Sequence, residues 1–238
     1  TMEMSYFGAK VLHPKTIAPI AAYHIPCYIK NTFKPDFEGS CVSDAPDQTG
    51  LAVKSISLLE KQTMVNVSGP GMKGLVGMAS RVFEAISRAG GSVSLITQSS
   101  SEYSICFCVP AVDALKVEAA LHDEFELELK DNFLDPIEFT DNLTIISIIG
   151  DGMKTKKGLS ARFFKALAQA GVNIVAIAQG ASERSISVVI DKQSANRAVI
   201  HTHQPYATAL GLIYDEIPPA VTTKSTESNP LVAKGTTG

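Results

Sequence analysis

The sequence predicts an α+β protein built from two copies of one β-α-β-β unit, and three observations support that fold class. The first is a repeat: Gly69-Pro-Gly-Met-Lys73 recurs as Gly150-Asp-Gly-Met-Lys154, and the offset of 81 residues holds without gaps for about 35 residues. The second is that each copy changes from β-rich sequence to apolar residues at helical spacing. The third is composition, because a 238-residue chain with 45% hydrophobic residues can bury roughly 70% of its unfolded surface.

Each copy begins with a strand and continues as a helix. The β-rich runs 64–68 and 143–149 stop at a Gly-x-Gly turn, where backbone with positive φ is cheap. Apolar residues then recur at helical spacing, and Gly90 or Gly171 ends the helix. The recurring apolar positions are Ala79, Val82, Phe83 and Ile86 in the first copy and Phe163, Phe164 and Leu167 in the second. One face of each helix is therefore expected to pack on a sheet.

The rest of each copy predicts a hairpin and a second helix. Apolar runs at 93–97 and 174–178 each end at a glutamine, and after a short polar turn a third strand begins near Ser104 or Ser185. Amphipathic stretches follow at 114–124 and 194–201. Short strands after these would complete a β-α-β-β-α-β arrangement of helices over an antiparallel sheet.

We divide the chain into four parts. Residues 1–45 carry a motif of their own, 52–140 form the first unit, 141–204 form the second, and 205–238, rich in Pro, Thr, Ser and Gly, are expected to be largely disordered. The start lacks the basic and apolar stretches of a signal peptide, so we expect a cytoplasmic fragment of a longer protein.

Composition argues against several classes of partner. A net charge of −3 provides no basic field for nucleic acid, and no apolar run approaches the roughly 20 residues of a membrane span. The four cysteines show neither zinc-site nor disulfide-framework spacing, and His201-x-His203 lacks further ligands, so no metal site is expected. No nucleophile, base and orienting acid can be assembled, and no catalytic residue is assigned.

Two phosphate-binding motifs are weaker than they first look. Residues 69–74 satisfy G-x-G-x-x-G between a strand and a helix, but the second copy has Thr155 in place of the last glycine. Each unit also continues into a hairpin where a dinucleotide-binding fold needs another crossover helix. In residues 152–158 a lysine precedes the last glycine, so the phosphate-loop order fails and a solvated basic turn is the simpler interpretation.

The repeated glutamines are the best candidates for binding a ligand. Gln98 and Gln179 end an apolar strand at the same place in both copies, and each offers two donors and an acceptor to a small polar molecule. The glycine turns are expected to present backbone N–H groups at a helix N-terminus, suited to a carboxylate. Asn173 and Ile174 could reach the same cavity if the units pack side by side. The structural alternatives are a tight turn and a glutamine that caps it.

Two segments carry a family resemblance. Residues 7–14, Phe-Gly-Ala-Lys-Val-Leu-His-Pro, followed by Ile25-Pro26 and Lys30-Asn31-Thr32, resemble the last part of an aspartokinase catalytic domain. The doubled unit, with Leu95-Ile-Thr-Gln-Ser-Ser-Ser-Glu102 and Ile177-Ala-Gln-Gly180, resembles the paired ACT domains of threonine-sensitive bifunctional aspartokinase/homoserine dehydrogenases.

The resemblance implies two ferredoxin-like ACT domains preceded by the C-terminal remnant of an α/β amino-acid kinase domain. It implies that the parent enzyme phosphorylates the side-chain carboxylate of L-aspartate with ATP and Mg, whereas the fragment lacks a complete active site and holds no cofactor. The front of the kinase is absent, and no homoserine dehydrogenase begins after Gln204. The leading strand, near 53–57, can in this family be separated from the unit it completes, so the first unit may be inserted within the second.

The resemblance also implies roles for particular residues. Lys10 and Val11 would border the ATP pocket of the parent kinase. Threonine is the favoured effector, and a homodimer or larger assembly through the ACT domains is expected. The effector-site candidates are Gln98, Gln179, Asn173, Ile174, Met72, Gly77, Met153 and Gly158. Two alternatives stay open: a ligand-free dimerisation module, and the incomplete sequence of a catalytically competent aspartokinase.

Overall fold

The computed structural model describes residues 13–43, 52–72, 76–98 and 103–207. Its N-terminal part holds one helix and a two-stranded antiparallel ribbon, in the order α2 (Pro14–Ala22), β1 (Cys27–Ile29) and β2 (Ser40–Val42). His13 begins α2 by accepting a hydrogen bond of 3.2 Å at its Nδ1 from the backbone N–H of Lys15.

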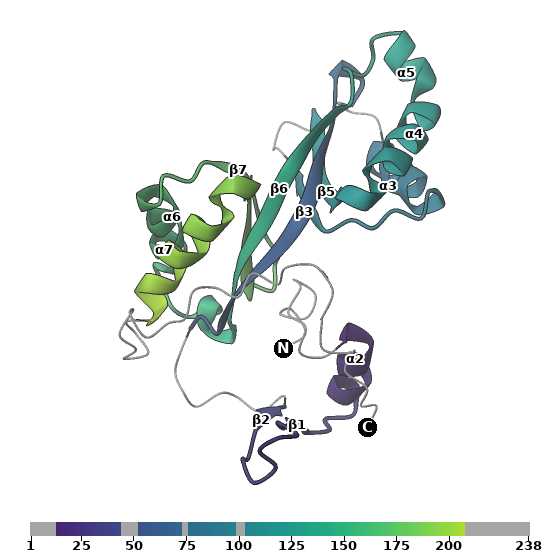
Figure 1. Cartoon of the computed structure of the whole chain (residues 1–238). Helices are drawn as coiled ribbons and strands as arrows, with labels where there is room; N and C mark the ends of the chain where they lie inside the picture. Colours follow the sequence, from purple (N-terminus) through teal and green to yellow (C-terminus); the bar gives the residue numbers. More distant parts are fainter. Residues whose placement is uncertain (1–12, 44–51, 73–75, 99–102, 208–238) are drawn as a thin grey trace, which may run out of the picture.

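Both predicted units are present, with their elements in the expected order (Figure 1). The first copy runs β3 (Ser55–Ser68), α3 (Met78–Arg88), β4 (Leu95–Gln98), β5 (Ser104–Pro110), α4 (Ala114–Glu124) and α5 (Glu126–Lys130). The second runs β6 (Glu138–Ile149), α6 (Leu159–Gln169), β7 (Ile174–Gln179), β8 (Ser185–Asp191) and α7 (Ala195–Ala207). The structure thus has the predicted fold, two βαββαβ units.

The two units share a single six-stranded sheet of order β4-β5-β3-β6-β8-β7. The long strands β3 and β6 run antiparallel along its centre. The C-terminal half of β3 pairs with β5, and the C-terminal half of β6 pairs with β8. Figure 1 shows the consequence: α3 and α4 lie beside one end of the β3–β6 ribbon, and α6 and α7 lie beside the other.

The leading half of β3 belongs to the sheet of the second unit. Residues 55–59 pair with 149–145 of β6, which pair in turn with β8. The backbone N–H of Lys54 donates to the carbonyl of Ile149 at 2.7 Å. The equivalent bond of the other copy runs from the N–H of Asp135, 81 residues after Lys54, to the carbonyl of Ser68 at 2.9 Å. The first unit is therefore inserted within the second, and the division at 140/141 places 55–59 in the wrong unit.

The same topology confirms the expected closing strand for the first copy, where 138–140 of β6 pair with 66–64 of β3, and corrects it for the second. The chain after β8 enters α7, which continues to Ala207, so residues 205–207 of the expected disordered tail are helical. The second unit needs no later strand, because 55–59 already occupies that place. The remaining tail lies outside the described residues.

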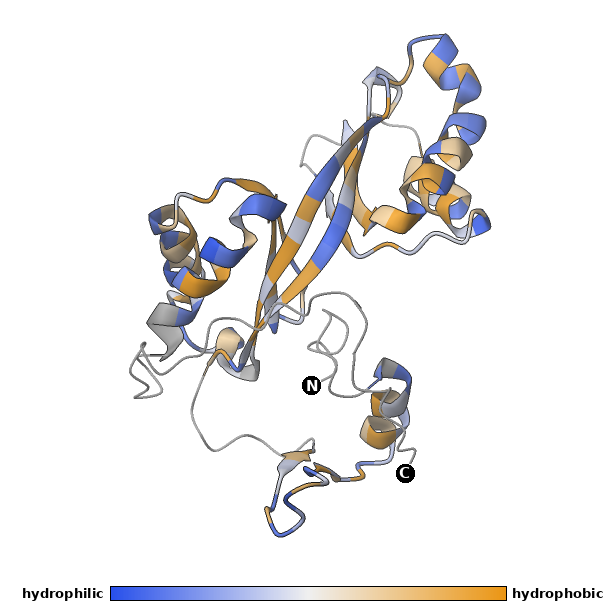
Figure 2. Ribbon diagram, viewed as in Figure 1, coloured by the Kyte–Doolittle hydropathy of each residue, from blue (hydrophilic) through white to orange (hydrophobic). Residues whose placement is uncertain are grey.

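Each unit has its own core between helices and sheet. In the first, Val65, Phe107, Val82 and Leu121 are fully buried between β3, β5, α3 and α4. In the second, residues of β6, β8, α6 and α7 pack in the same way: Ile146, Ile148, Phe163, Leu167, Val188 and Ala198. Full burial of one such large apolar side chain contributes about 1.5–3 kcal/mol. Figure 2 shows the resulting alternation of apolar and polar residues along β3 and β6.

A third apolar cluster lies on the other face of the sheet and joins the units. It contains Leu95, Cys108, Leu143, Ile145 and Val189, which come from β4, β5, β6 and β8.

Among the described residues, no helix is long and apolar enough to span a bilayer.

Candidate functional site

Gln98 lies at the same edge of the sheet as the first glycine turn. It pairs with Ile105 of β5, while Ser104 pairs with Ser68, the last residue of β3. Gly69 follows directly, so Gln98 is two strand spacings, about 10 Å, from the turn. The Gln98 side chain is exposed. The first unit therefore places the carboxamide and the turn at the same edge of the sheet.

The second unit repeats the arrangement. Gln179 pairs with Ile186, and Ser185 pairs with Ile149, the residue before Gly150. Gln179 is likewise exposed at the end of its strand. Each glutamine thus stands at the strand end nearest its own glycine turn, where it is accessible to a ligand.

In the first glycine turn the leading N–H groups are used within the fold, so they are not available to a carboxylate. The N–H groups of Gly69, Gly71 and Met72 already donate to Tyr103, Phe133 and Gly69 at 2.7–3.1 Å. A Cβ on Gly69 would lie 2.6 Å from Leu134 Cα. These glycines let the segment that leads into β6 pass close to the turn.

Backbone donors that take no part in the helical hydrogen-bond pattern lie a few residues later, near the helix N-termini. Gly77 caps α3 with φ of 96°, and Gly158 caps α6 with φ of 86°. The first helical bonds run from Arg81 to Gly77 and from Arg162 to Gly158, so the N–H groups of 78–80 and of 160–161 lie outside the hydrogen-bond pattern of their helices. The positive end of a helix dipole favours an anion such as a carboxylate. Nothing lies within 4 Å of a Cβ built on either cap.

The two methionines of the repeated turns face the cores. Met72 is 5% exposed within the core of the first unit, and Met153 packs partly buried against that of the second. Both hold their turns against the sheet, so an effector could reach only their main chains without disturbing the core.

Asn173 and Ile174 are not near Gln179. Ile174 opens β7 and Gln179 ends it, so the two are about 17 Å apart along the strand. Ile174 packs partly buried against the core of the second unit, and Asn173 is exposed beside it. The structure does not bring them to the Gln179 end of their own unit.

The strands that carry the two glutamines touch each other. The hydroxyl of Thr97, beside Gln98, hydrogen-bonds the carbonyl of Ile177 in β7. Ile96 and Ile177 occupy equivalent places in the repeat and remain 51% and 48% exposed. The ends of β4 and β7 are therefore linked across the two units.

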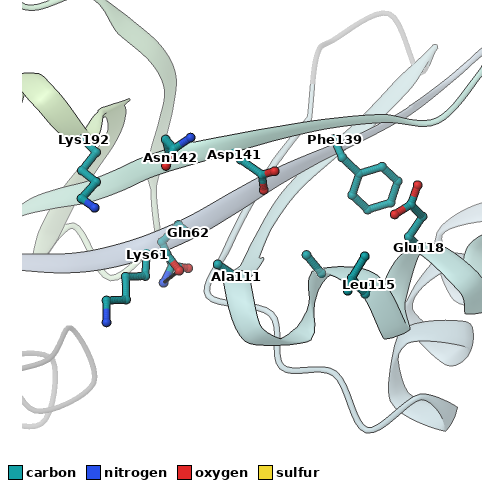
Figure 3. A pocket seen from close by; sticks show the side chains of 10 residues that line it. Lys61, Gln62, Ala111, Leu115, Glu118, Phe139, Asp141, Asn142 and Lys192 are labelled. Atoms are coloured by element: carbon teal, nitrogen blue, oxygen red, sulfur yellow. Dashed lines mark hydrogen bonds between the residues drawn. The ribbon is translucent and has the colours of Figure 1, made fainter. Parts of the chain in front are cut away.

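A further feature, which the sequence analysis missed, is a hollow of about 480 Å³ where β3 and β6 pass between the units (Figure 3). We call it the inter-unit hollow. Its lining combines charged, amide and apolar side chains: Lys61, Gln62, Ala111, Ala114, Leu115, Glu118, Phe139, Asp141, Asn142 and Lys192. No repeated motif marks these positions, because the two copies carry different residues there.

The strongest ion-pair cluster lies away from both features. Arg81 of α3 bonds Glu124 at 2.8 Å and also Glu128, and its guanidinium lies 4.6 Å from the centre of the Phe125 ring. Hydrogen bonds from Arg81 lower the pKa of both carboxyl groups, and Arg88 lowers that of Glu124 further. The cluster fastens α3 to α4 and α5.

The predicted nucleotide contacts cannot be placed, because Lys10 and Val11 lie outside the described residues. The four cysteines are unpaired thiols. Burial raises the pKa of Cys108 to about 12, so its thiol stays protonated. Within the described ranges no cluster of three or more His, Cys, Asp or Glu side chains is arranged to hold a metal ion.

Comparison with known proteins relates this architecture to one family. The family model described as ACT domain matches residues 65–125 and 146–206. The bifunctional aspartokinase/homoserine dehydrogenase of Haemophilus influenzae is 58% identical over 203 residues, covering 85% of this chain and 25% of the relative. The chain thus spans about a quarter of that relative's length.

Two solved structures share the fold. The regulatory subunit of aspartate kinase from Thermus thermophilus, in a ligand-free form, superposes with a TM-score of 0.56 at 26% identity, over 64% of this chain and 97% of that one. E. coli aspartokinase III in complex with lysine and aspartate superposes with a TM-score of 0.67 at 25% identity, over 86% of this chain and 44% of that one.

Proposed function

This chain belongs to the ACT-domain family and corresponds to the regulatory ACT region of an aspartokinase, and we propose that the amino acid it senses is threonine. The observation that carries the proposal is the matched placement of Gln98 and Gln179. Each stands at the strand end nearest its glycine turn, and each turn leads into the N-terminus of a helix.

This arrangement suits the two ends of a free amino acid. The N–H groups of 78–80 or of 160–161 would receive the carboxylate, where the helix dipole favours negative charge. The carboxamide of Gln98 or Gln179 would accept from the ammonium group or hydrogen-bond the hydroxyl of threonine. A hydroxyl can be selected strongly when the site is built to bond it, because an analogue without it leaves a polar group unpaired.

Regulation of an attached kinase would follow from the link between the units. The bond from Thr97 to Ile177 joins the strand that carries Gln98 to the one that carries Gln179. Ligand binding that favours one arrangement of these strands by about 1–3 kcal/mol would suffice for allosteric control. For the parent protein we propose phosphorylation of L-aspartate by ATP with Mg, with Lys10 and Val11 beside the nucleotide, in the cytoplasm.

A homodimer or larger assembly is part of the proposal. β4 and β7 are edge strands of the sheet, and their exposed apolar residues Ile96, Val175 and Ile177 could be covered by a second copy. The same surface favours the second candidate function, a dimerisation module that binds no ligand.

Titration calorimetry with threonine, lysine and methionine tests the proposal. The account predicts saturable heat with threonine and weaker or no binding of the other two. A dimer by light scattering with no heat from any of the three would support the dimerisation module instead. Saturable binding of lysine or methionine in place of threonine would keep the sensor and overturn its specificity.

A further inference from the structure

The inter-unit hollow is lined by equivalent positions of the two copies. Lys61 and Asn142 are 81 residues apart and both adopt the left-handed conformation, with φ of 58° and 60°. Ala111 and Lys192, also 81 apart, begin the short 3-10 turns Ala111–Asp113 and Lys192–Ser194. The hollow therefore lies where the repeat relates one unit to the other, and its side chains have diverged in charge.

The backbone at Lys61 departs from regular strand geometry. The pairing of β3 with β6 shifts register between Leu59 and Gln62 and again between Gln62 and Met64. A lysine at positive φ is uncommon, and such residues gather at binding sites, where the surrounding structure holds them. Lys61 and Gln62, at this irregularity, both line the hollow (Figure 3).

Gln62 supplies a buried acceptor that the described residues leave without a partner. Its side chain is 2% exposed, and its Nε2 donates to the carbonyls of Glu60 at 3.0 Å and Lys61 at 3.4 Å. Its Oε1 has no hydrogen bond. Buried polar atoms are nearly always satisfied, so this unpaired carbonyl oxygen points to a donor from outside the chain, either an ordered water or a group of a ligand.

The charges around the hollow are of both signs. Figure 3 shows Lys61 and Lys192 on one side and Glu118 on the other, with Asp141 between them. Asp141 is held in place by the hydroxyl of Thr63, which donates to its Oδ1 at 2.6 Å. A purely anionic ligand would leave the two carboxylates without a positive partner, and a purely cationic ligand would leave the two lysines without a negative one.

Apolar side chains complete the lining. Leu115 of α4 and Phe139 of β6 lie beside Glu118 (Figure 3). A volume of about 480 Å³ falls in the range of small-molecule pockets, for which an apolar wall with a few placed polar groups is typical.

We propose that the inter-unit hollow binds a small zwitterion with an apolar body. Its anionic group meets Lys61 and Lys192, its ammonium group meets Asp141, which lies between the lysines and Glu118, and its apolar body lies toward Leu115 and Phe139. This is a second ligand site, separate from Gln98 and Gln179, and it does not rest on threonine binding there.

Calorimetry on the full chain tests the proposal with L-leucine and two matched analogues. One analogue, 4-methylpentanoate, lacks the amino group, and the other, 3-methylbutylamine, lacks the carboxylate. The proposal predicts saturable leucine binding and at least tenfold weaker binding of both analogues, a loss of about 1.4 kcal/mol or more.

Variants locate the site. Lys192→Ala and Asp141→Asn are expected to weaken leucine binding at least tenfold, because each removes one charge from the part of the lining that holds the charged groups of leucine. Lys130→Ala, an exposed lysine of α5, and the double variant Gln98→Ala with Gln179→Ala are expected to leave it unchanged. Melting curves check that each variant is folded, and the exposed Lys192 can be replaced without opening the core.

Three results would overturn the proposal. They are no saturable binding at about 10 mM leucine, binding unaffected by both Lys192→Ala and Asp141→Asn, and equal binding of 4-methylpentanoate, which would indicate a simple anion site. Loss of leucine binding in the double glutamine variant would assign it to the threonine site. Failure of threonine to bind would leave the leucine prediction standing, so the two proposals fail separately.

Discussion

The hydroxyl of Thr97 donates a hydrogen bond of 3.0 Å to the backbone carbonyl of Ile177. This bond spans 80 residues of sequence and joins the edge strand of one unit to the edge strand of the other. It lies one residue before Gln98 and two before Gln179, so it is well placed to couple the two candidate effector sites.

Thr97→Val removes this bond and keeps the shape of the side chain. We expect unfolding to become easier by only about 1 kcal/mol, the usual contribution of one hydrogen bond. Cooperativity between the two sites should fall, as measured by calorimetry. Thr140→Val, at an exposed position of β6, is the matched control. Unchanged cooperativity in Thr97→Val would show that the coupling runs elsewhere.

Gly150→Ala should destabilise the fold by about 3 kcal/mol, the upper range for overpacking. The backbone at Gly150 is extended, so the cost arises from contact alone: a Cβ would lie 2.0 Å from the carbonyl oxygen of Ala52. Urea unfolding measures the change. Gly180→Ala, where the nearest atom is 3.8 Å away, is expected to be nearly neutral. An equal loss of stability in Gly150→Ala and Gly180→Ala would contradict the packing of 52–53 on this turn.

Arg81→Met should lower stability by about 1 kcal/mol near neutral pH, because its partly exposed ion pairs are screened by solvent. Arg81 lowers the folded-state pKa of Glu124 and of Glu128. The stability that these two carboxylates contribute is therefore present above their ordinary pKa of 4.5, and it is lost as the pH falls through their lowered pKa values.

Thermal unfolding between about pH 7 and pH 3 checks this prediction. The natural chain should lose more stability on acidification than Arg81→Met does. Arg162→Met, the equivalent change in the second unit, serves as control because Arg162 is exposed on α6. Parallel pH profiles for the natural chain and Arg81→Met would refute the assigned role of the cluster.

The thiol of Cys108 should resist alkylation in the folded chain. Only the thiolate reacts, and burial raises the pKa of Cys108 to about 12. Cys41 is exposed and should be modified first. Mass spectrometry after brief treatment with iodoacetamide distinguishes the two, and labelling of Cys108 at the rate of Cys41 would show that β5 opens readily.

Much of the fold could be predicted from sequence, because the repeat appears twice and its apolar spacing agrees in both copies. The helices at Met78 and Leu159 and the strand ends at Gln98 and Gln179 follow from that spacing. The insertion of one unit within the other could not be derived from periodicity, since strand pairing across the long β3 and β6 is a non-local choice.

The candidate sites show a similar division. The glutamines were identified because both copies share them, whereas the glycine turns were assigned to ligand binding when close packing against 133–135 and Ala52 explains them. The inter-unit hollow left no signal in the sequence. Its site depends on Lys61 and Asn142 at positive φ, and a lysine within a strand pattern gives no indication of that conformation.

The most direct test of the sensor is threonine calorimetry on the natural chain and on Gln98→Ala and Gln179→Ala. Both side chains are exposed, so their removal should leave the melting temperature nearly unchanged. We expect each variant to lose the site of its own unit, with affinity there reduced at least tenfold, or about 1.4 kcal/mol. Threonine affinity that stays the same in both variants would contradict the account.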